Sequence, residues 1–193
     1  MAGPRATTTK RWTYADYAAL DDGKRHEVIG GRVVKAPPLT SQHQAISRDL
    51  EFLLLRFVKE RGLGEVYYAP LDVVLGDNDV FQPDILFVAS ANLAIVRQAG
   101  VFGAPDLAIE VLSPSTAEND RYHKRGAYER FGVKEYWLVD PENRTIEVLA
   151  NGPKGYELHS FAAPDGKAQS KILQGFEVAV RDVVSPKRPD GPA

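Results

Sequence analysis

The sequence predicts an α/β (α+β) protein in which a mixed central sheet is flanked by helices. Runs of β-branched and aromatic residues alternate along the chain with segments of helical periodicity. The most apolar run, LAIEVL (107–112), is apolar on both faces, which is typical of a central strand covered on both sides. We therefore expect one domain over residues 12–184, between flexible tails at 1–11 and 185–193.

The first third of the chain predicts a helix, a hairpin and a longer helix. WTYADYAAL (12–20) suits a short helix with Thr13 as its N-cap. RHEVIGGRVVKA (25–36) reads as a tight hairpin around Gly30-Gly31. Residues 41–62 predict a long helix that begins with a serine cap and ends in glycine. Its apolar residues recur at helical spacing: Ile46, Leu50, Leu53, Leu54 and Phe57.

The rest of the chain predicts mostly strands. EVYYAPLDVVLG (65–76) and QPDILFVA (82–89) read as strands joined by a turn, and residues 90–104 as a loop with a short helix. A second helix is expected from about Thr116 to Phe131, ending at Gly132. Later strands are expected at EYWLVD (135–140), TIEVLA (145–150), GYELHSF (155–161) and around FEVAVRDVV (176–184).

Composition excludes several classes of protein. The chain has no cysteine, which excludes disulfides, thiolate zinc sites and cysteine catalysis. It has no apolar run long enough to cross a membrane and no apolar signal-peptide core, so a cytoplasmic protein is expected. A formal net charge of −2 argues against a strong, non-specific DNA-coating role and leaves room for a local basic patch. No G-x-S-x-G elbow, P-loop or dinucleotide fingerprint is present.

Glu110 interrupts the apolar strand LAIEVL. Strand alternation puts Ala108, Glu110 and Leu112 on one face. A carboxylate inside a protein must be paired, protonated or bound to a metal ion, because burying it unpaired costs several kcal/mol or more. Asp106 lies on the same face, but four strand residues span roughly 13 Å, so these two acids cannot share an ion.

Asp84 is the better neighbour for Glu110. It follows Pro83 and opens DILFV, an apolar run that we expect to pair with LAIEVL. Cross-strand neighbours lie about 5 Å apart, which is close enough for two carboxylates to hold one hard cation. Mg²⁺ prefers such oxygen ligands and usually keeps several waters.

Lys124 is expected to point toward these acids. The apolar end of its helical face should pack on the sheet, beyond the end of LAIEVL. A lysine there can stabilise an anionic transition state or position a water. Two structural alternatives stay open: an exposed i, i+4 pair with Asp120, or a buried pair of Glu110 with Lys124 or an arginine and no metal. The residues sharing the face are Asp120, Lys124, Ala127, Tyr128 and Phe131.

The ordered set QPDILFV, IEVLSPST, D-x-x-x-K and GVKEYWLVDP resembles the PD-(D/E)xK nuclease superfamily. More narrowly it is similar to the Uma-type family of restriction-endonuclease-like proteins, from about Tyr14 to Leu149. The resemblance implies a restriction-endonuclease-like fold with metal-binding acids on adjacent strands. Asp84 would be the motif aspartate, Glu110 the second acid, and the backbone carbonyl of Val111 a third ligand.

The sequence departs from the superfamily motif at the lysine. That lysine would stand two residues after Glu110, where Leu112 is found, and Lys124 matches its place in the following helix in the narrower family. The resemblance also covers Glu27 in HEVIGG, as an outer metal ligand or water-orienting group, and the SQHQ opening of the long helix. Glu27 could instead be a surface residue. His43 is a candidate for the cleft or a capping or surface residue. The basic residues that either solvate a helix or touch phosphates are Arg121, Arg125, Arg130 and Lys134.

Taken together, these features predict a metal-dependent nuclease that hydrolyses phosphodiester bonds, as a DNA endonuclease using Mg²⁺ or Mn²⁺. The resemblance implies a homodimer, because many relatives by fold act as dimers, and a dimer would also widen a modest basic surface. The alternatives are a catalytically inactive nucleic-acid-binding or scaffold protein that retains the fold, and a structural acid cluster without metal. Metal affinity separates the last reading from the other two, and turnover separates the enzyme from the binding protein.

Overall fold

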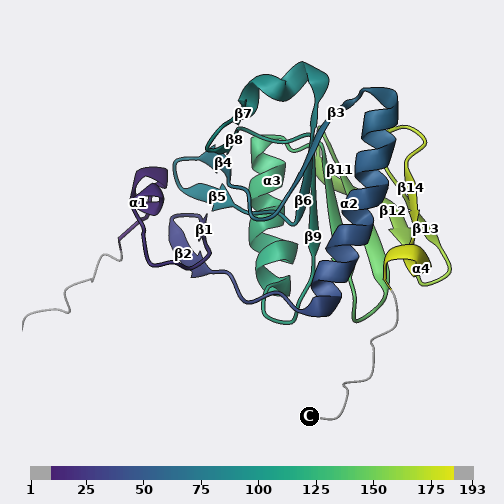
Figure 1. The fold of residues 1–193 in the computed structure, drawn as a ribbon, viewed down its shortest axis with the longest axis horizontal. Helices are drawn as coiled ribbons and strands as arrows, with labels where there is room; N and C mark the ends of the chain where they lie inside the picture. The colour runs from purple at the N-terminus through teal and green to yellow at the C-terminus, as the bar shows by residue number, and fades with distance from the viewer. Residues whose placement is uncertain (1–9, 185–193) are drawn as a thin grey trace, which may run out of the picture.

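A six-stranded mixed sheet forms the centre of the protein in the computed structural model, which describes residues 10–184 (Figure 1). Its strand order is β12-β11-β10-β9-β6-β3. β9 and β10 run parallel, and every other neighbouring pair in this sheet is antiparallel. The predicted fold class is confirmed. The strands are β3 (Gly64–Tyr68), β6 (Ile85–Ala89), β9 (Leu107–Val111), β10 (Glu135–Asp140), β11 (Thr145–Gly152) and β12 (Gly155–Ala162).

Helices cover both faces of this sheet, and β9 is buried along its whole length (Figure 1). Alternate β9 side chains enter two separate apolar cores, as strand periodicity predicts. The core that contains Leu107, Ile109 and Val111 is closed by α2 (Ser41–Arg61). The other core, with Ala108 and Leu112, is closed by α3 (Arg125–Phe131).

α2 is the predicted long helix, with one correction at its start. Thr40, and not Ser41, is the N-cap, because the Thr40 side chain accepts a hydrogen bond from the His43 N–H at 3.1 Å. Gly62 ends the helix in the left-handed conformation, with φ 62°. The apolar stripe faces the sheet and buries Ile46, Leu50, Leu54 and Val58.

A second six-stranded sheet, which the sequence did not predict, packs on the α3 side. The predicted short helix is α1 (Tyr14–Ala18), and Thr13 caps it in a capping box. The predicted hairpin is β1–β2, turning through Gly30 and Gly31, both at positive φ. The strands, in the order β2-β1-β5-β4-β8-β7, are β1 (His26–Ile29), β2 (Arg32–Lys35), β5 (Asp79–Phe81), β4 (Val73–Gly76), β8 (Gly100–Phe102) and β7 (Val96–Arg97).

Three predicted segments differ from the structure. The single strand expected at 65–76 is divided between β3 and β4 of different sheets, because Pro70 has no N–H to continue a ladder. The strand expected at 82–89 begins only at Ile85. Residues 90–104 contain the short helix η1 (Ser90–Ile95) as expected, but also β7 and β8.

The helix predicted from Thr116 to Phe131 starts at Ala117 and contains a π-helical segment, η2 (Asn119–Lys124), before α3. Gly132 ends it at φ 85°, as predicted. The strand expected around 176–184 ends at Ala179, because the chain then turns into α4 (Val180–Val183). Two short strands, β13 (Lys167–Gln169) and β14 (Glu177–Ala179), form a small third sheet.

The predicted tails lie outside the described residues, except for Lys10 and Arg11. Lys10, expected in the N-terminal tail, forms an ion pair with Asp16 at 2.8 Å. No helix within residues 10–184 is long and apolar enough to cross a membrane.

Candidate active site

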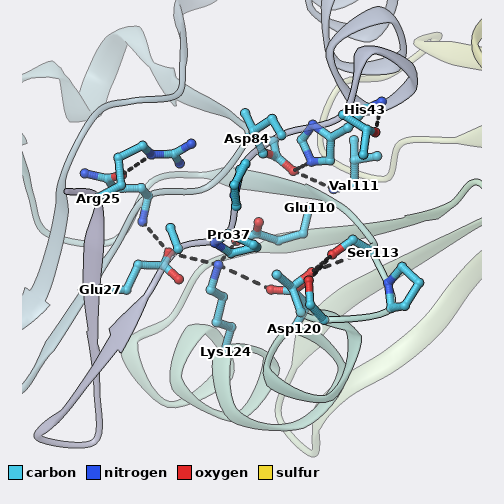
Figure 2. Close-up of a pocket in the computed structure, with 18 residues that line it drawn as sticks. Arg25, Glu27, Pro37, His43, Asp84, Glu110, Val111, Ser113, Asp120 and Lys124 are labelled. Atoms are coloured by element: carbon cyan, nitrogen blue, oxygen red, sulfur yellow. Dashed lines mark hydrogen bonds and ion pairs between the residues drawn. The ribbon is translucent and has the colours of Figure 1, made fainter. Parts of the chain in front are cut away.

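Asp84 and Glu110 come together because β6 and β9 pair antiparallel, as predicted. Ile85 is opposite Ile109, so Asp84, one residue earlier, and Glu110, one residue later, stand at the same end of the strand pair. The Val111 N–H donates to Asp84 Oδ2 at 2.7 Å and ties the two strands at this point. Both acids are buried, and they line a cavity of about 240 Å³ (Figure 2).

Lys124 projects into the same cavity and meets three carboxylates (Figure 2). Its Nζ lies 2.9 Å from Glu27 Oε1, 3.0 Å from Glu110 Oε1 and 3.3 Å from Asp120 Oδ1. The residue is 5% exposed. The inward orientation predicted for Lys124 is confirmed. The i, i+4 pair of Lys124 with Asp120 exists but is buried, so the alternative of an exposed pair is wrong. The pairing of Glu110 with Lys124 is observed.

The π-helical segment η2 supplies both Asp120 and Lys124. Wide π turns are rare and occur frequently at functional sites. The hydroxyl of Tyr136 donates to the backbone oxygen of Asp120 at 3.0 Å, and the hydroxyl of Tyr128 donates to Glu110 Oε1 at 3.2 Å. Two buried tyrosines therefore fix this helix against the sheet beside the acids.

The charges in this cluster act strongly on one another. Burial raises the pKa of Glu110 well above its ordinary value, and Lys124 opposes that rise. Nearby Asp120, Asp84 and Glu27 add to it, because they carry the same charge. Burial alone would lower the pKa of Lys124, but the carboxylates outweigh burial and raise it well above its ordinary value. The acids therefore keep Lys124 charged, whereas burial favours the protonated form of Glu110.

Glu27 is held inside by the loop before Asp84. It is 8% exposed, so the alternative of a surface position is wrong. Its Oε1 accepts the Gln82 N–H at 2.7 Å. The Gln82 side chain in turn donates to Asp72 Oδ1 at 2.8 Å and accepts from Arg25 Nε at 3.0 Å. Sequence reasoning missed Gln82, although it stands two residues before Asp84.

His43 reaches Asp84 from the first turn of α2. Its Nε2 lies 3.0 Å from Asp84 Oδ2, and its Nδ1 lies 3.4 Å from Ser47 Oγ. Its side chain caps nothing, because Thr40 is the cap. The structure therefore brings His43 into the cluster from the opposite side to Lys124 (Figure 2).

Other predicted polar residues lie apart from the cavity. Asp106 binds Lys134 Nζ at 2.6 Å, the Asn92 amide and the Ala89 N–H, which agrees with its exclusion from the site. The basic residues expected to solvate a helix or touch phosphate mostly pair with acids. Arg121 pairs with Asp140 and Glu147, Arg130 with Asp79, and Lys134 with Asp106.

The donor set at the strand ends suits a hard cation. Among hydrogen bonds within residues 10–184, Asp84 uses Oδ2 and Glu110 uses Oε1, which leaves Asp84 Oδ1 and Glu110 Oε2 without a donor. Carboxylate and carbonyl oxygens are the ligands that Mg²⁺ prefers. No group of three His, Asp or Glu side chains in the described part of the chain is arranged around one ion. A metal ion here would depend on two carboxylates, the Val111 carbonyl and waters.

All six residues predicted for the site line this one cavity. They are Glu27, His43, Asp84, Glu110, Val111 and Lys124. Asp120 joins them, although the sequence had placed it only on the same helical face as Lys124. Its Oδ1 is buried and takes no well-formed hydrogen bond from residues 10–184, although Lys124 Nζ lies 3.3 Å away. Burial raises the pKa of the Asp120 carboxyl, against the effect of Lys124.

Known proteins share this fold and sequence pattern. A solved structure described as "a putative nuclease belonging to DUF820" from Anabaena variabilis superposes with a TM-score of 0.75 at 20% identity, over 90% of this chain and 97% of that one. An uncharacterised protein of Synechocystis sp. is 26% identical over 137 residues, which are 69% of this chain and 77% of that protein. Residues 13–181 match the Uma2 family, described as "Putative restriction endonuclease", and the chain therefore belongs to the Uma2 family of restriction-endonuclease-like proteins.

Proposed function

We propose that this protein is a metal-dependent nuclease that hydrolyses phosphodiester bonds, as an endonuclease acting on DNA. The observation that carries the proposal is the pairing of Asp84 and Glu110 at one end of β6 and β9, each with a carboxylate oxygen that takes no hydrogen bond from residues 10–184. Membership of the Uma2 family supports it.

Asp84, Glu110 and the backbone carbonyl of Val111 would hold Mg²⁺ or Mn²⁺. When bound, such an ion lowers the pKa of a water and neutralises charge on the scissile phosphate. Asp84 is held for this task from two sides, by the Val111 N–H and by His43. Fixed carboxylates lose little freedom when they take up a ligand, so the site is preorganised.

Lys124 would donate a hydrogen bond to the attacking water or to a non-bridging phosphate oxygen. Its raised pKa keeps it charged at neutral pH, so it can stabilise the negative charge that develops on the phosphate. Glu27 and Asp120 hold its ammonium in place from two further directions. We therefore assign Lys124 to catalysis, and His43 and Glu27 to positioning.

The second candidate function is a nucleic-acid-binding or scaffold protein that keeps this fold without cleavage. The contact of Lys124 with three carboxylates favours it, because the lysine already neutralises part of the charge that would attract a metal ion. Turnover separates the two functions.

A homodimer is part of the proposal and awaits its own test. With a formal net charge of −2, one copy offers few free cations to a phosphate backbone. Two copies would double that surface. Light scattering after gel filtration measures the mass directly, and a monomer at micromolar concentration would rule out the dimer.

The first experiment is a calorimetric titration of wild-type protein with Mn²⁺ and Mg²⁺, beside Asp84→Asn and Glu110→Gln. We expect binding that both substitutions abolish. Asp182→Asn is the matched control, because this exposed acid on α4 lies outside the cavity, and it should bind as the wild type does. Supercoiled plasmid and short DNA and RNA strands are then incubated with the metal that binds. A folded wild type that binds neither ion, with or without DNA, would contradict the nuclease.

A further inference from the structure

A second cavity, of about 500 Å³, adjoins the candidate active site and shares Asp84 with it. One wall is the polar face of the first three turns of α2, and the other is the end of β3. Apart from Asp84, none of the residues that line this cavity has been given a role above. Its polar and aromatic lining includes Ser41, Gln44, Ser47, Arg48, Glu51 and Tyr68.

Tyr68 brings an aromatic ring to the edge of the site. It is the last residue of β3, pairs with Ile85 and therefore lies beside Asp84. The next residue, Ala69, donates its N–H to the backbone oxygen of Asp84 at 3.0 Å, which fixes the end of β3 at this place. Tyr68 is nevertheless 59% exposed, and no aromatic ring within residues 10–184 stacks on it. An exposed ring on a fixed backbone is a surface on which a flat ligand can stack.

The facing wall carries polar groups that the protein leaves free. The Gln44 amide makes no hydrogen bond with any described residue, and the Glu51 carboxyl has no cationic partner among them. Glu51 is partly buried, and burial raises the pKa of its carboxyl. Amide and carboxyl groups are those that proteins use to recognise the donor and acceptor edges of nucleobases.

We infer that this cavity binds one unstacked nucleobase of the strand to be cut, with its face on Tyr68 and its edge toward Gln44. The inference rests on the proposed nuclease function and narrows its substrate to single-stranded or locally opened nucleic acid. A base stacked inside a duplex could enter only after it had been unstacked and unpaired, which costs a few kcal/mol. Because Asp84 lies between the two cavities, the bound base belongs to a nucleotide next to the scissile phosphate.

The test compares strands with and without bases. We would measure, by fluorescence anisotropy with EDTA present, the affinity for a labelled oligothymidylate, for an abasic strand of the same length, and for a blunt duplex. An oligouridylate repeats the measurement for RNA. The variants are Tyr68→Ala and Tyr68→Phe, with Phe161→Ala as the control, because Phe161 is an equally exposed aromatic residue (55%) on β12, away from both cavities.

The expected result is that wild type prefers the base-containing single strand and that Tyr68→Ala weakens this binding about tenfold or more. Tyr68→Phe and Phe161→Ala should bind as wild type does. Tyr68→Ala should leave the affinity for the abasic strand unchanged. A misfolded variant would lose affinity for that strand too. Equal affinity of wild type and Tyr68→Ala for oligothymidylate, or no binding of any single strand by wild type, overturns the inference.

The same experiments separate this inference from the proposed function. The wild type could cleave with a metal ion while Tyr68→Ala binds single strands as tightly as wild type does. That result would contradict the base site and support the nuclease. Tyr68-dependent binding by a protein that cleaves nothing with any divalent ion would keep the base site and favour the binding protein. Stronger binding of oligouridylate than of oligothymidylate would assign the site to RNA.

Discussion

Lys124 Nζ lies 3.0 Å from Glu110 Oε1, although fourteen residues separate the two in the chain. Both residues are buried: Glu110 on the central strand β9, and Lys124 in η2. The acid that interrupts the strand LAIEVL thus meets its cation from the helix that immediately follows. Removing one member of such a pair leaves an uncompensated charge inside the protein, which costs far more than losing an exposed pair.

Lys124→Met should lower the free energy of unfolding by about 3–5 kcal/mol in metal-free buffer, because Glu110, Glu27 and Asp120 lose their shared cation. Urea denaturation measures the loss. With saturating Mn²⁺ the loss should shrink, because the proposed metal ion replaces positive charge beside Glu110. Lys154→Met, at an exposed turn, is the control and should stay within about 0.5 kcal/mol of wild type. A similar loss with and without Mn²⁺ would argue against an ion beside Glu110.

His43→Ala should weaken Mn²⁺ binding about 10- to 100-fold, because His43 holds the carboxylate of Asp84 at 3.0 Å and such supporting contacts tune a metal ligand. Calorimetry measures the affinity. His159→Ala, on the exposed face of β12, should leave the affinity unchanged. If His43→Ala binds Mn²⁺ as tightly as wild type, His43 has no positioning role.

Asp106→Asn should make stability less dependent on pH in acid. Burial would raise the pKa of Asp106, but Lys134, the Ala89 N–H and Asn92 outweigh burial and lower it below its ordinary value of 3.8. A lowered pKa stabilises the folded state fully above pH 3.8, and this contribution is lost as the pH falls through the lowered pKa. The free energy of unfolding of wild type should therefore exceed that of Asp106→Asn by about 2 kcal/mol at neutral pH.

That difference should narrow steadily below pH 3.8 in a series of urea titrations. The control is Asp182→Asn, whose exposed carboxyl should give no comparable difference at any pH. The difference in unfolding free energy between wild type and Asp106→Asn could instead stay constant down to the lowest pH of reversible folding. That result would show that the charge of Asp106 does not contribute to stability.

Glu135→Ala should loosen the C-terminal part of the fold. Glu135 is fully buried at the start of β10, and its carboxylate accepts four hydrogen bonds, from the Trp137 indole, the Ser170 hydroxyl and the N–H groups of Lys171 and Ile172. Without this acceptor the buried donors have no hydrogen-bond partner, so the free energy of unfolding should fall by about 3 kcal/mol or more.

Because three of those donors lie in the segment between β13 and β14, trypsin should cut Glu135→Ala faster after Lys171 than it cuts wild type. Mass spectrometry of the fragments identifies the bond. Glu157→Ala, on the exposed face of β12, is the matched control. Equal cleavage of Glu135→Ala and wild type at Lys171 would mean that Glu135 does not hold this segment.

Much of the site followed from local rules. Alternation along a strand placed Glu110 on its face, and the pairing of two neighbouring apolar strands placed Asp84 beside it. Helical spacing directed Lys124 inward. These rules concern residues on long elements with strong periodicity, where burial of one face leaves little freedom in register.

The rest of the site depends on contacts that no local pattern carries. Glu27 reaches Lys124 only because the hairpin β1–β2 joins a second sheet, whose strands of two to four residues are too short to show a period. The division of residues 65–76 between two sheets arises at Pro70 and depends on the partners that each half finds. The π turn lies in a segment whose spacing predicted an ordinary helix, because π turns are rare and carry no periodic pattern of their own.

The π turn makes the length of the chain between β9 and α3 a property of the site. A π turn holds more residues than an α turn, so deleting one residue from Asn119–Lys124 would let the segment relax to an α-helix. Residues three apart still share one face of an α-helix, so after a deletion between them Asp120 and Lys124 would remain neighbours, with the Lys124 ammonium shifted relative to Glu110. The π turn therefore sets how Lys124 meets Asp120 and Glu110, and the length of this segment is part of the geometry of the site.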